Sequence, residues 1–336
     1  MVEIKTYAPA VISTLNRYEH FKRCLESLEK CKGAEYTDVY VGLDYPPSEK
    51  YVEGWKKIDS YLQQKEVKNG FKKLVVIRRE HNFGVSGVNS NYGRLVRDEI
   101  INKYDRFLPV EDDNEFSPNY LEFVNQGLEL YKDDEKCTAI CGYNYYGMSI
   151  PENYRESTYL SREFSGWGCG YWTEKWKLFA DRLNINYEKE IMNSWKRIWT
   201  IYKHEPRLLN TIILNIQIGR AFGDTLYVCQ QYLDDYYSVF PVLSKVRNHG
   251  FDGSGTTIFK PDEFHNKQVI DEKHDFEMNR LYVVDDKVQK EVEKCFERSL
   301  FLNIVIFIRV FVFYLSGIDI LFFEQKRRNK SLFKKK

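Results

Sequence analysis

Short apolar runs rich in β-branched residues recur through the first 143 residues of the chain. They lie at Val11–Leu15, Val39–Leu43, Leu74–Ile77, Phe107–Val110 and Thr138–Cys141. Between these runs, apolar residues recur at the three- and four-residue spacing of a helix. Strands that alternate with helices predict a largely parallel sheet covered by helices on both faces. We therefore expect an α/β, Rossmann-like fold.

Two helices of this half have recognisable starts. Asn16 is a candidate N-cap, and Glu19 follows it at the spacing of a capping box. Ser117 followed by Pro118 predicts a second start, with serine as the N-cap and proline in the first turn. Both starts come directly after a predicted strand or its turn.

Polar residues follow each of the first four predicted strands. They are Thr14, Asn16 and Arg17 after the first strand, Asp44 after the second, His81 and Asn82 after the third, and Glu111, Asp112 and Asp113 after the fourth. In a parallel sheet, ligands bind beyond the carboxyl ends of the strands. The sequence therefore predicts one site at this edge.

The run Glu111-Asp112-Asp113 has the chemistry of a cation site for phosphorylated ligands. Mg²⁺ and Mn²⁺ prefer oxygen ligands and often take one or two carboxylates together with substrate phosphates. The alternative is that the run only begins a solvated turn. Its position directly after the buried run FLPV favours the cation site.

Four segments resemble the GT-A fold glycosyltransferases, particularly those of family 2. They are VISTLNRYEHFKRCLESL, HNFGVSGVNSNYGRL, FLPVEDDNEFSPNYLEF and VFPVLSKVRNHGFDGSGT, and the resemblance covers about residues 8–257. It implies a GT-A catalytic domain at 1–257, with a nucleotide-sugar half at 1–143 and an acceptor half at 144–257. The third segment looks like the family's acidic metal motif.

The resemblance also implies roles for individual residues. Asp113 would bind Mn²⁺ or Mg²⁺, Asp44 would contact the nucleotide base, and Glu111 and Asp112 would face the ribose and sugar. Donor-binding residues carried over in this way are Thr14, Arg17, Asp44, Asn82, Gly84, Asn89, Glu111, Asp112, Trp167 and Gly168.

The glycine-rich segment 84–89 allows two interpretations. Its backbone amides could approach a phosphate at a helix start, or its glycines could serve only close packing at the helix entry. The loop 164–170 also allows two interpretations, because its three glycines and neighbouring aromatic rings suit either the wall of a ligand site or a buried turn.

An inverting transferase needs a carboxylate as general base for the acceptor hydroxyl. We call the fourth segment, VFPVLSKVRNHGFDGSGT, the closing segment. Asp224 is the first candidate, because it lies 28 residues before Asp252 of the closing segment, where similar enzymes place such a group. It could instead cap a helix. Glu174 is the second candidate. Asp234 and Asp235 suit a helix end better.

The closing segment departs from the family in one position. Similar sequences often carry a histidine directly after Gly-Ser-Gly-Thr, which the resemblance implies to be a metal ligand, whereas this chain has Thr257. His249 lies upstream and could substitute as a ligand if the loop folds differently. Otherwise Asp113, phosphates and water would hold the metal.

The carboxyl-terminal part changes character. Residues 258–298 are highly charged and predict an appended helical or irregular subdomain, and residues 299–336 predict an apolar helix with a basic tail. The apolar stretch Leu300–Phe323 could span a bilayer by length, but Asn303, Arg309 and Asp319 interrupt it. We expect a peripheral helix on an anionic membrane at the cytoplasmic face. The alternative is a helix packed on the catalytic domain.

The charge distribution bears on the binding partners of the protein, and the cysteine content bears on its cellular compartment. The net charge is +1, but the last eleven residues hold seven of the 50 basic residues, which leaves 43 basic against 49 acidic residues before them. Such a body is unsuited to a nucleic-acid backbone. The seven cysteines form no CxxC pair and predict reduced, cytosolic thiols. The amino terminus has no pattern of a signal peptide.

These features together predict a metal-assisted, inverting glycosyltransferase of cell-surface polysaccharide synthesis. It would move a hexosyl or N-acetylhexosaminyl group from a nucleotide-diphosphate sugar, with UDP favoured, to a glycan or lipid-linked acceptor. A nucleotidyltransferase is one alternative, although TLNRYEHF lacks the glycine-rich phosphate loop of that class. A non-catalytic module that binds a membrane surface is the other.

Overall fold

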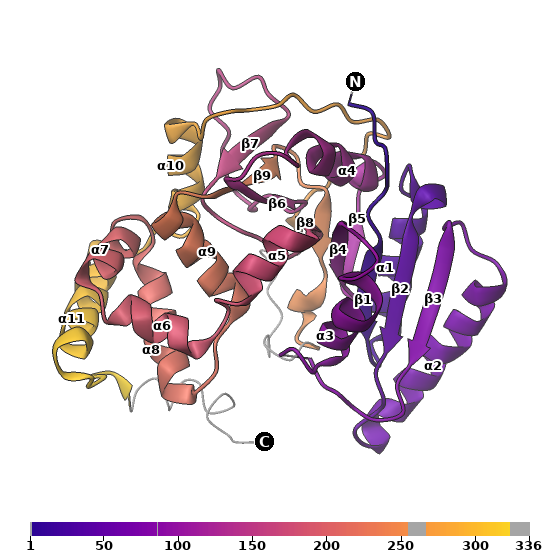
Figure 1. Ribbon diagram of the computed structural model, residues 1–336, viewed down its shortest axis with the longest axis horizontal. Coiled ribbons are helices and arrows are strands. Elements are labelled where there is room, and N and C mark those ends of the chain that lie inside the picture. Colours follow the sequence, from indigo (N-terminus) through magenta and orange to yellow (C-terminus); the bar gives the residue numbers. More distant parts are fainter. Residues whose placement is uncertain (1, 86, 255–266, 323–336) are drawn as a thin grey trace.

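The main sheet has eight strands in the order β3-β2-β1-β4-β8-β6-β9-β7 (Figure 1). A computed structural model describes residues 2–85, 87–254 and 267–322. The strands are β1 Ala10–Thr14, β2 Asp38–Leu43, β3 Lys73–Arg78, β4 Arg106–Glu111, β6 Cys137–Cys141, β7 Thr158–Ser161, β8 Cys169–Trp172 and β9 Tyr237–Pro241. Within this sheet, β7 and β8 run antiparallel to their neighbours and the other strands run parallel to one another. The predicted α/β class with a mostly parallel sheet is confirmed.

Helices cover both faces of this sheet (Figure 1). The helices and short helical turns are α1 Tyr18–Glu29, η1 Ala34–Tyr36, α2 Glu49–Val67, α3 Asn91–Leu95, η2 Val96–Ile100, α4 Tyr120–Leu130, α5 Thr173–Ala180, α6 Ile185–Met192, α7 Trp195–His204, α8 Pro206–Ile218, α9 Gly223–Asp234, η3 Gly250–Asp252, α10 Asp286–Lys294 and α11 Leu300–Ser316. Helices α1, α2 and α4 pack on one face, and α3 and α5–α11 contribute to the core on the other.

The central strands contribute side chains to both hydrophobic cores, because successive side chains of a strand point to opposite faces of the sheet. Ala10 and Ile12 of β1 belong to the core under α1, α2 and α4, whereas Val11 between them belongs to the other. In β2, Tyr40 faces away from its neighbours Val39 and Val41 in the same way. Burial on both faces explains why these strands are continuous apolar runs rather than alternating ones.

The two predicted helix starts were wrong by one and two residues. Helix α1 begins at Tyr18 with Arg17 as the N-cap residue, and no side chain caps it, so Asn16 is not the cap. Helix α4 begins at Tyr120 with Asn119 as the N-cap residue. Ser117 instead continues the extended segment, since its backbone amide donates to the carbonyl of Lys245 at 2.9 Å, and its carbonyl accepts from the amide of Tyr120 at 3.0 Å in the turn before the helix.

The described part of the predicted appended subdomain lies directly on the main body. Its residues up to α10 run along α4 in an irregular path held by side chains of that helix. The amide side chain of Gln126 bonds the carbonyl of Phe276 at 2.7 Å and the amide of Met278 at 3.0 Å. Tyr131 accepts from the amide of Leu281 at 2.8 Å. This segment and α10 therefore extend the two cores.

The last described helix, α11, is 17 residues long and ends at Gly317, which has a left-handed conformation. It packs on α8 through Ile306 and Val310, which are buried. Among the described residues, no helix has the length and apolar character needed to cross a bilayer. All seven cysteines are free thiols in this structure.

Candidate active site

A small second sheet brings the closing segment of the sequence to the acidic run. β5 (Asn114–Phe116) continues from that run and pairs antiparallel with β10 (Val246–Asn248). Asn248 donates from Nδ2 to Asp113 Oδ1 at 3.2 Å and lies 3.4 Å from Glu111 Oε2. We call Glu111, Asp112 and Asp113 the acidic rim. Residues 137 positions apart in the sequence thus meet at the carboxyl end of β4.

The carboxyl end of β1 supplies a hydroxyl and a cation to the acidic rim. Thr14 donates from Oγ1 to Asp112 Oδ2 at 3.0 Å. The Arg17 guanidinium bonds Asp112 and lies 2.8 Å from Asp113 Oδ2. Burial alone would lower the pKa of Arg17, but the two carboxylates outweigh it and raise that pKa. The parallel pairing of β1 with β4 therefore joins the two predicted donor-binding segments.

Asp44, at the carboxyl end of β2, organises the loop that follows β3. Its carboxylate accepts from the backbone amides of Phe83 and Gly84, each at 2.9 Å, and from Asn82 Nδ2 at 3.1 Å. Burial raises the pKa of Asp44, and the backbone donors act against that rise. The amide of Gly84 is consequently used within the protein, so its predicted contact with a phosphate finds no support in this geometry.

The rest of the glycine-rich segment serves helix entry. Ser90 is the N-cap residue of α3 and accepts from the amide of Gly93 at 3.1 Å. A Cβ at Gly93 would lie 2.6 Å from the carbonyl oxygen of Val88, so a larger residue would clash there. Asn89 is exposed, and its Oδ1 accepts from Arg97 at 3.4 Å. These contacts favour the packing interpretation over a phosphate site.

Asp224 approaches the acidic rim from the acceptor half. It lies in the first turn of α9, and Phe222 rather than Asp224 is the N-cap residue. Asp224 and Glu111 are both accessible to solvent, yet each is surrounded by enough protein for burial to raise its pKa. The charges of Asp113 and Asp224 raise the pKa of Glu111 further. Accessible carboxyl groups with raised pKa values are typical of catalytic positions.

The loop 164–170 packs tightly between the acidic rim and the acceptor half. A Cβ at Gly168 would lie 2.5 Å from the side chain of Val246, and this glycine has φ +59°. Trp167 meets the ring of Tyr143 at a centroid distance of 4.7 Å and that of Phe251 at 5.5 Å. A Cβ at Gly166 would lie 3.6 Å from Asp224. The glycines therefore permit close approach, and the loop borders the candidate base.

Glu174 is not part of this group. Strand β8 runs antiparallel to β4, so Trp172 pairs with Arg106 at the amino end of β4, opposite the acidic rim. Glu174 follows in α5, where its side chain is 83% exposed and pairs with Lys177 at 2.7 Å. A catalytic role for Glu174 does not fit this position, which is far from the acidic rim. The sequence could not show this, because it does not reveal that β8 runs antiparallel to β4.

His249 lies beside the acidic rim, but its ring is bound elsewhere. Its backbone amide donates to the carbonyl of Asp113 at 2.8 Å, while Nε2 lies 2.7 Å from Glu115 Oε2. This hydrogen bond holds the pKa of Glu115 below its usual range. The geometry therefore does not favour His249 as a metal ligand. Thr257 lies outside the described residues.

The fit of a divalent cation rests on Asp113. Among the residues that the structure describes, no group of three or more His, Cys, Asp or Glu side chains is arranged to hold a metal. Asp113 Oδ1 faces Asn248 and Oδ2 faces Arg17. A cation bound mainly by diphosphate oxygens needs only one or two protein carboxylates, so this donor set is compatible with Mn²⁺ or Mg²⁺.

Two further residues of this site, Asn248 and Gly250, could not be predicted from the sequence. Asn248 bonds Asp113 and Glu111, and Gly250 leaves the space that the Asp113 carboxylate occupies. Both belong to the closing segment that carried part of the resemblance. Their only sequence signal was that position, because asparagine and glycine are also ordinary turn residues.

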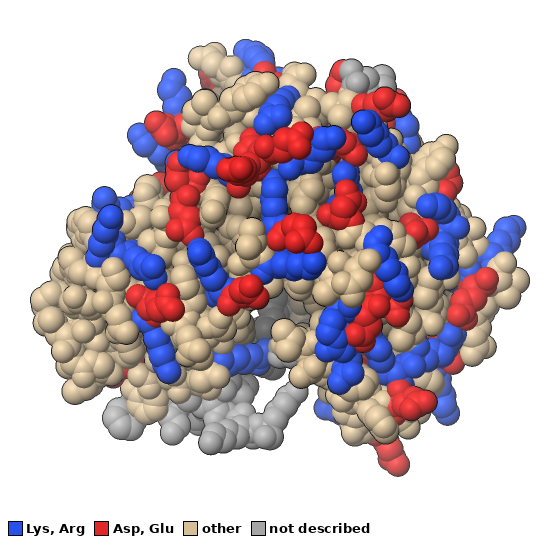
Figure 2. Space-filling model, viewed as in Figure 1, with Lys and Arg blue, Asp and Glu red and all other residues tan. Residues whose placement is uncertain are grey.

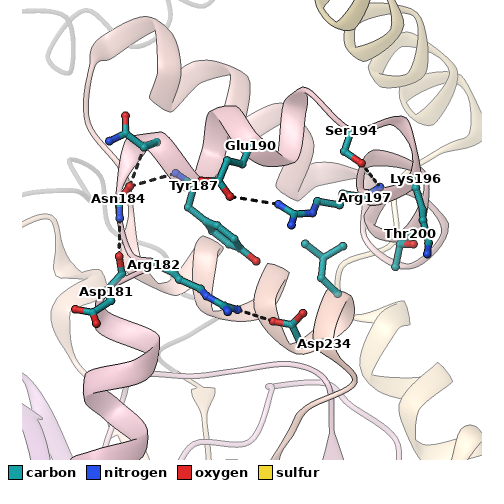
Figure 3. Close-up of a pocket in the computed structure, with 12 residues that line it drawn as sticks. Asp181, Arg182, Asn184, Tyr187, Glu190, Ser194, Lys196, Arg197, Thr200 and Asp234 are labelled. Carbon is teal, nitrogen blue, oxygen red and sulfur yellow. Dashed lines mark hydrogen bonds and ion pairs between the residues drawn. The ribbon is translucent and has the colours of Figure 1, made fainter.

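A separate pocket of about 530 Å³ lies among α6, α7 and the end of α9 (Figure 3). Arg182 pairs with Asp234 at 2.8 Å, Arg197 pairs with Glu190 at 3.5 Å, and Tyr187 lies between the two arginines. The pocket lies at Asp234, the last residue of α9, and the candidate base Asp224 lies in the first turn of the same helix. The helical rise between these two residues is about 15 Å. Since its arginines are already paired with carboxylates, the pocket gives no evidence for a ligand.

No family model and no curated protein matches this sequence. Among solved structures, S. aureus TarS 1–349 in complex with UDP is similar at 14% identity and a TM-score of 0.39, over 72% of this chain and 60% of that one. S. aureus TarS matches at 16% identity and a TM-score of 0.33, over 52% of this chain and 30% of that one. The glycosyltransferase GlyE of Streptococcus pneumoniae TIGR4 matches at 14% identity and a TM-score of 0.36, over 70% and 45%. The chain thus spans 30% to 60% of the length of these solved chains.

Proposed function

We propose that this protein is a GT-A type glycosyltransferase that moves a hexosyl or N-acetylhexosaminyl group from a nucleotide-diphosphate sugar, with UDP as the first nucleotide to test. The acceptor we propose is a glycan or lipid-linked sugar of a cell-surface polysaccharide. The observation that carries the proposal is the meeting of Thr14, Arg17, the acidic rim and Asn248 at the carboxyl end of β1 and β4.

The donor's diphosphate would lie at this edge because ligands of parallel α/β sheets bind beyond the carboxyl ends of the strands. Asp113 is the residue that would hold Mn²⁺ or Mg²⁺, and such an ion supplies neutralisation of the negative charge that develops on the leaving diphosphate. Arg17 already faces the same carboxylate and adds a second positive charge. Asp44 supports the donor side indirectly, by fixing the loop at residues 82–84.

Asp224 is the general base of this proposal. Its carboxylate would take the proton of an acceptor hydroxyl while the hydroxyl oxygen attacks the anomeric carbon and the nucleotide diphosphate departs. Three observations support the choice: Asp224 is accessible, its pKa is raised by burial, and its charge reaches Glu111 of the acidic rim. One carboxylate on the face opposite the leaving group gives inversion at the anomeric carbon.

The loop 164–170 would form the wall between donor and acceptor. Trp167 packs against Tyr143 and Phe251, and Gly166 borders Asp224. Aromatic faces suit the apolar faces of sugar rings. This wall is the part of the proposal that concerns the acceptor.

A turnover screen tests the proposed function. Release of nucleoside diphosphate from a panel of UDP-, GDP- and dTDP-sugars is measured with Mn²⁺, with Mg²⁺ and with chelator. We expect slow hydrolysis of one nucleotide class, stimulated by the cation and by an added sugar acceptor. Release of pyrophosphate from sugar phosphates and nucleoside triphosphates, without turnover of any nucleotide sugar, would establish a nucleotidyltransferase instead.

A further inference from the structure

One surface in which apolar side chains face solvent is formed by α11, by the residues that follow it as far as Ile320 and by Trp199 of α7. The large apolar side chains of this surface that are exposed are Trp199, Leu300, Phe301, Leu302, Ile304, Ile308, Phe311, Tyr314, Leu315, Ile318 and Ile320. Figure 2 shows few charged side chains over the region of α7 and α11 in Figure 1. We call these residues the apolar face. Monomeric soluble proteins rarely leave a contiguous apolar patch of this extent without a partner.

The apolar face follows from the double-sided character of α11. Ile304, Ile308, Phe311 and Leu315 recur at the spacing of one helix face and are all exposed. The opposite side of the helix packs on α8, where Ile306 is buried. A helix that is apolar all round and covered on one side leaves the other side for a second apolar environment.

The charged residues that interrupt the apolar sequence do not reach this face. Arg309 is fully buried and donates from Nε and Nη2 to the two oxygens of Asp319 at 2.8 and 2.7 Å. Arg309 also donates to the carbonyl of Asn210 on α8 at 3.3 Å. The pair neutralises itself on the inner side of α11. Arg309 and Asp319, which interrupt the apolar stretch in the sequence, therefore do not oppose contact between this face and a membrane.

Aromatic contacts fix α7 and α11 as one unit. The ring of Trp195 lies 5.7 Å from that of Phe311 and 5.4 Å from that of Tyr314. Tyr202 donates to the carbonyl of Asn303 at 3.0 Å, and Trp199 stacks on Tyr202 at 5.6 Å. Tryptophan and tyrosine are the residues that membrane–water interfaces favour.

We infer that the apolar face docks on the surface of an anionic lipid bilayer, with α11 lying in the membrane plane. Two observations select this occupant over a second copy of the chain or another protein. The face is bordered by tryptophan and tyrosine, and the sequence that follows it, Lys326–Lys336, contains seven basic residues and no acidic one. An apolar helix beside a basic cluster matches a surface of acyl chains and negative headgroups. This inference goes beyond the proposed function, since it does not depend on the reaction.

Vesicle sedimentation of the full chain tests the inference. Vesicles of phosphatidylcholine alone are compared with vesicles that also contain phosphatidylglycerol, at low and high salt. We expect strong binding to the anionic vesicles, weakened by salt. A triple variant, Ile304→Ser, Ile308→Ser and Phe311→Ser, should lower the partition coefficient by more than about tenfold, because burial of these side chains drives insertion.

A matched control removes exposed apolar side chains elsewhere. Val67→Ser, Tyr282→Ser and Val283→Ser change three residues that are at least 75% exposed and lie outside the apolar face. This control should bind vesicles as the wild type does. Unfolding midpoints and nucleotide binding, measured on both triple variants, show whether each is folded and keep this test separate from that of the proposed function.

Three outcomes would overturn the inference. One is a wild-type chain that stays in the supernatant with anionic vesicles. The second is a folded Ile304, Ile308 and Phe311 variant that sediments as well as the wild type. The third is light scattering that shows a wild-type dimer which ignores vesicles and which the variant converts to a monomer, because the occupant would then be a second copy.

Discussion

A Cβ atom at Gly250 would lie 2.3 Å from Oδ2 of Asp113. At this position the closing segment comes so close to the Asp113 carboxylate that a side chain on residue 250 would collide with it. The neighbouring Asn248 uses the same approach to bond the other oxygen of Asp113. The position of the candidate metal ligand is thus set by a backbone almost 140 residues away.

Gly250→Ala should displace the Asp113 carboxylate and lower kcat/KM for the nucleotide sugar by at least about tenfold, because small displacements of catalytic groups are costly. Gly127→Ala is the control. Its added Cβ would lie 2.8 Å from the side chain of Ile140 in the core. That variant should lose stability while the folded fraction keeps normal kinetics. Equal kinetic effects from both variants would argue that Gly250 acts only through stability.

Asp224→Asn should lower kcat by about 10² to 10⁴-fold, the usual contribution of a general base, with the donor KM changed far less. Asp286→Asn is the control, because Asp286 also lies in the first turn of a helix but in α10. Steady-state kinetics with donor and acceptor measures both. A normal kcat in Asp224→Asn would remove this residue from the mechanism.

The pH profile gives a second test of Asp224. A base acts only when deprotonated, and burial raises the pKa of this carboxyl. Transfer should therefore rise with pH through an ionisation above the ordinary range of aspartate, and the rising limb should vanish from the residual activity of Asp224→Asn. A profile flat from acid to neutral pH in the wild type would contradict the assignment.

Glu188 should make the protein less stable as the pH rises. It is fully buried, and burial raises its pKa from 4.5 to about 7, although Asn215 donates to it. For a pKa raised on folding, the stability is complete below about pH 4.5 and is lost as the pH rises through about 7. Glu188→Gln keeps an acceptor for Asn215 and should gain up to about 3 kcal/mol over the wild type at alkaline pH. Urea unfolding of both proteins across this range measures the difference, and parallel curves would contradict the prediction.

The parallel half of the fold could be predicted because its pattern is local. The apolar runs that became β1–β4 and β6 are continuous, and the polar residues after them lie at one edge because parallel strands place them there. The same logic predicts that Thr14, Arg17 and Asp112 lie at one edge, where Asp112 accepts a hydrogen bond from Thr14 and pairs with Arg17.

The acceptor half could not be predicted in this way because its contacts depend on direction and pairing. Glu174 was wrongly predicted to lie at the site, because nothing in the sequence shows that β8 runs antiparallel to β4. Asn248 and Gly250 were missed because their roles exist only through the pairing of β5 with β10. His249 was a candidate metal ligand only if its loop folded differently from the family's, and its ring turns to Glu115 on the neighbouring strand.

Calorimetric titration with UDP and Mn²⁺ tests the central claim, that Asp113 of the acidic rim holds a divalent cation that binds the diphosphate of a sugar donor. The wild type should bind UDP in the presence of Mn²⁺, and Asp113→Ala should bind it at least about tenfold more weakly while keeping the same circular dichroism and unfolding midpoint. GDP and dTDP are titrated in parallel to cover the other nucleotides. Binding of equal strength in Asp113→Ala, or a wild type that binds none of the three with Mn²⁺, would contradict the account.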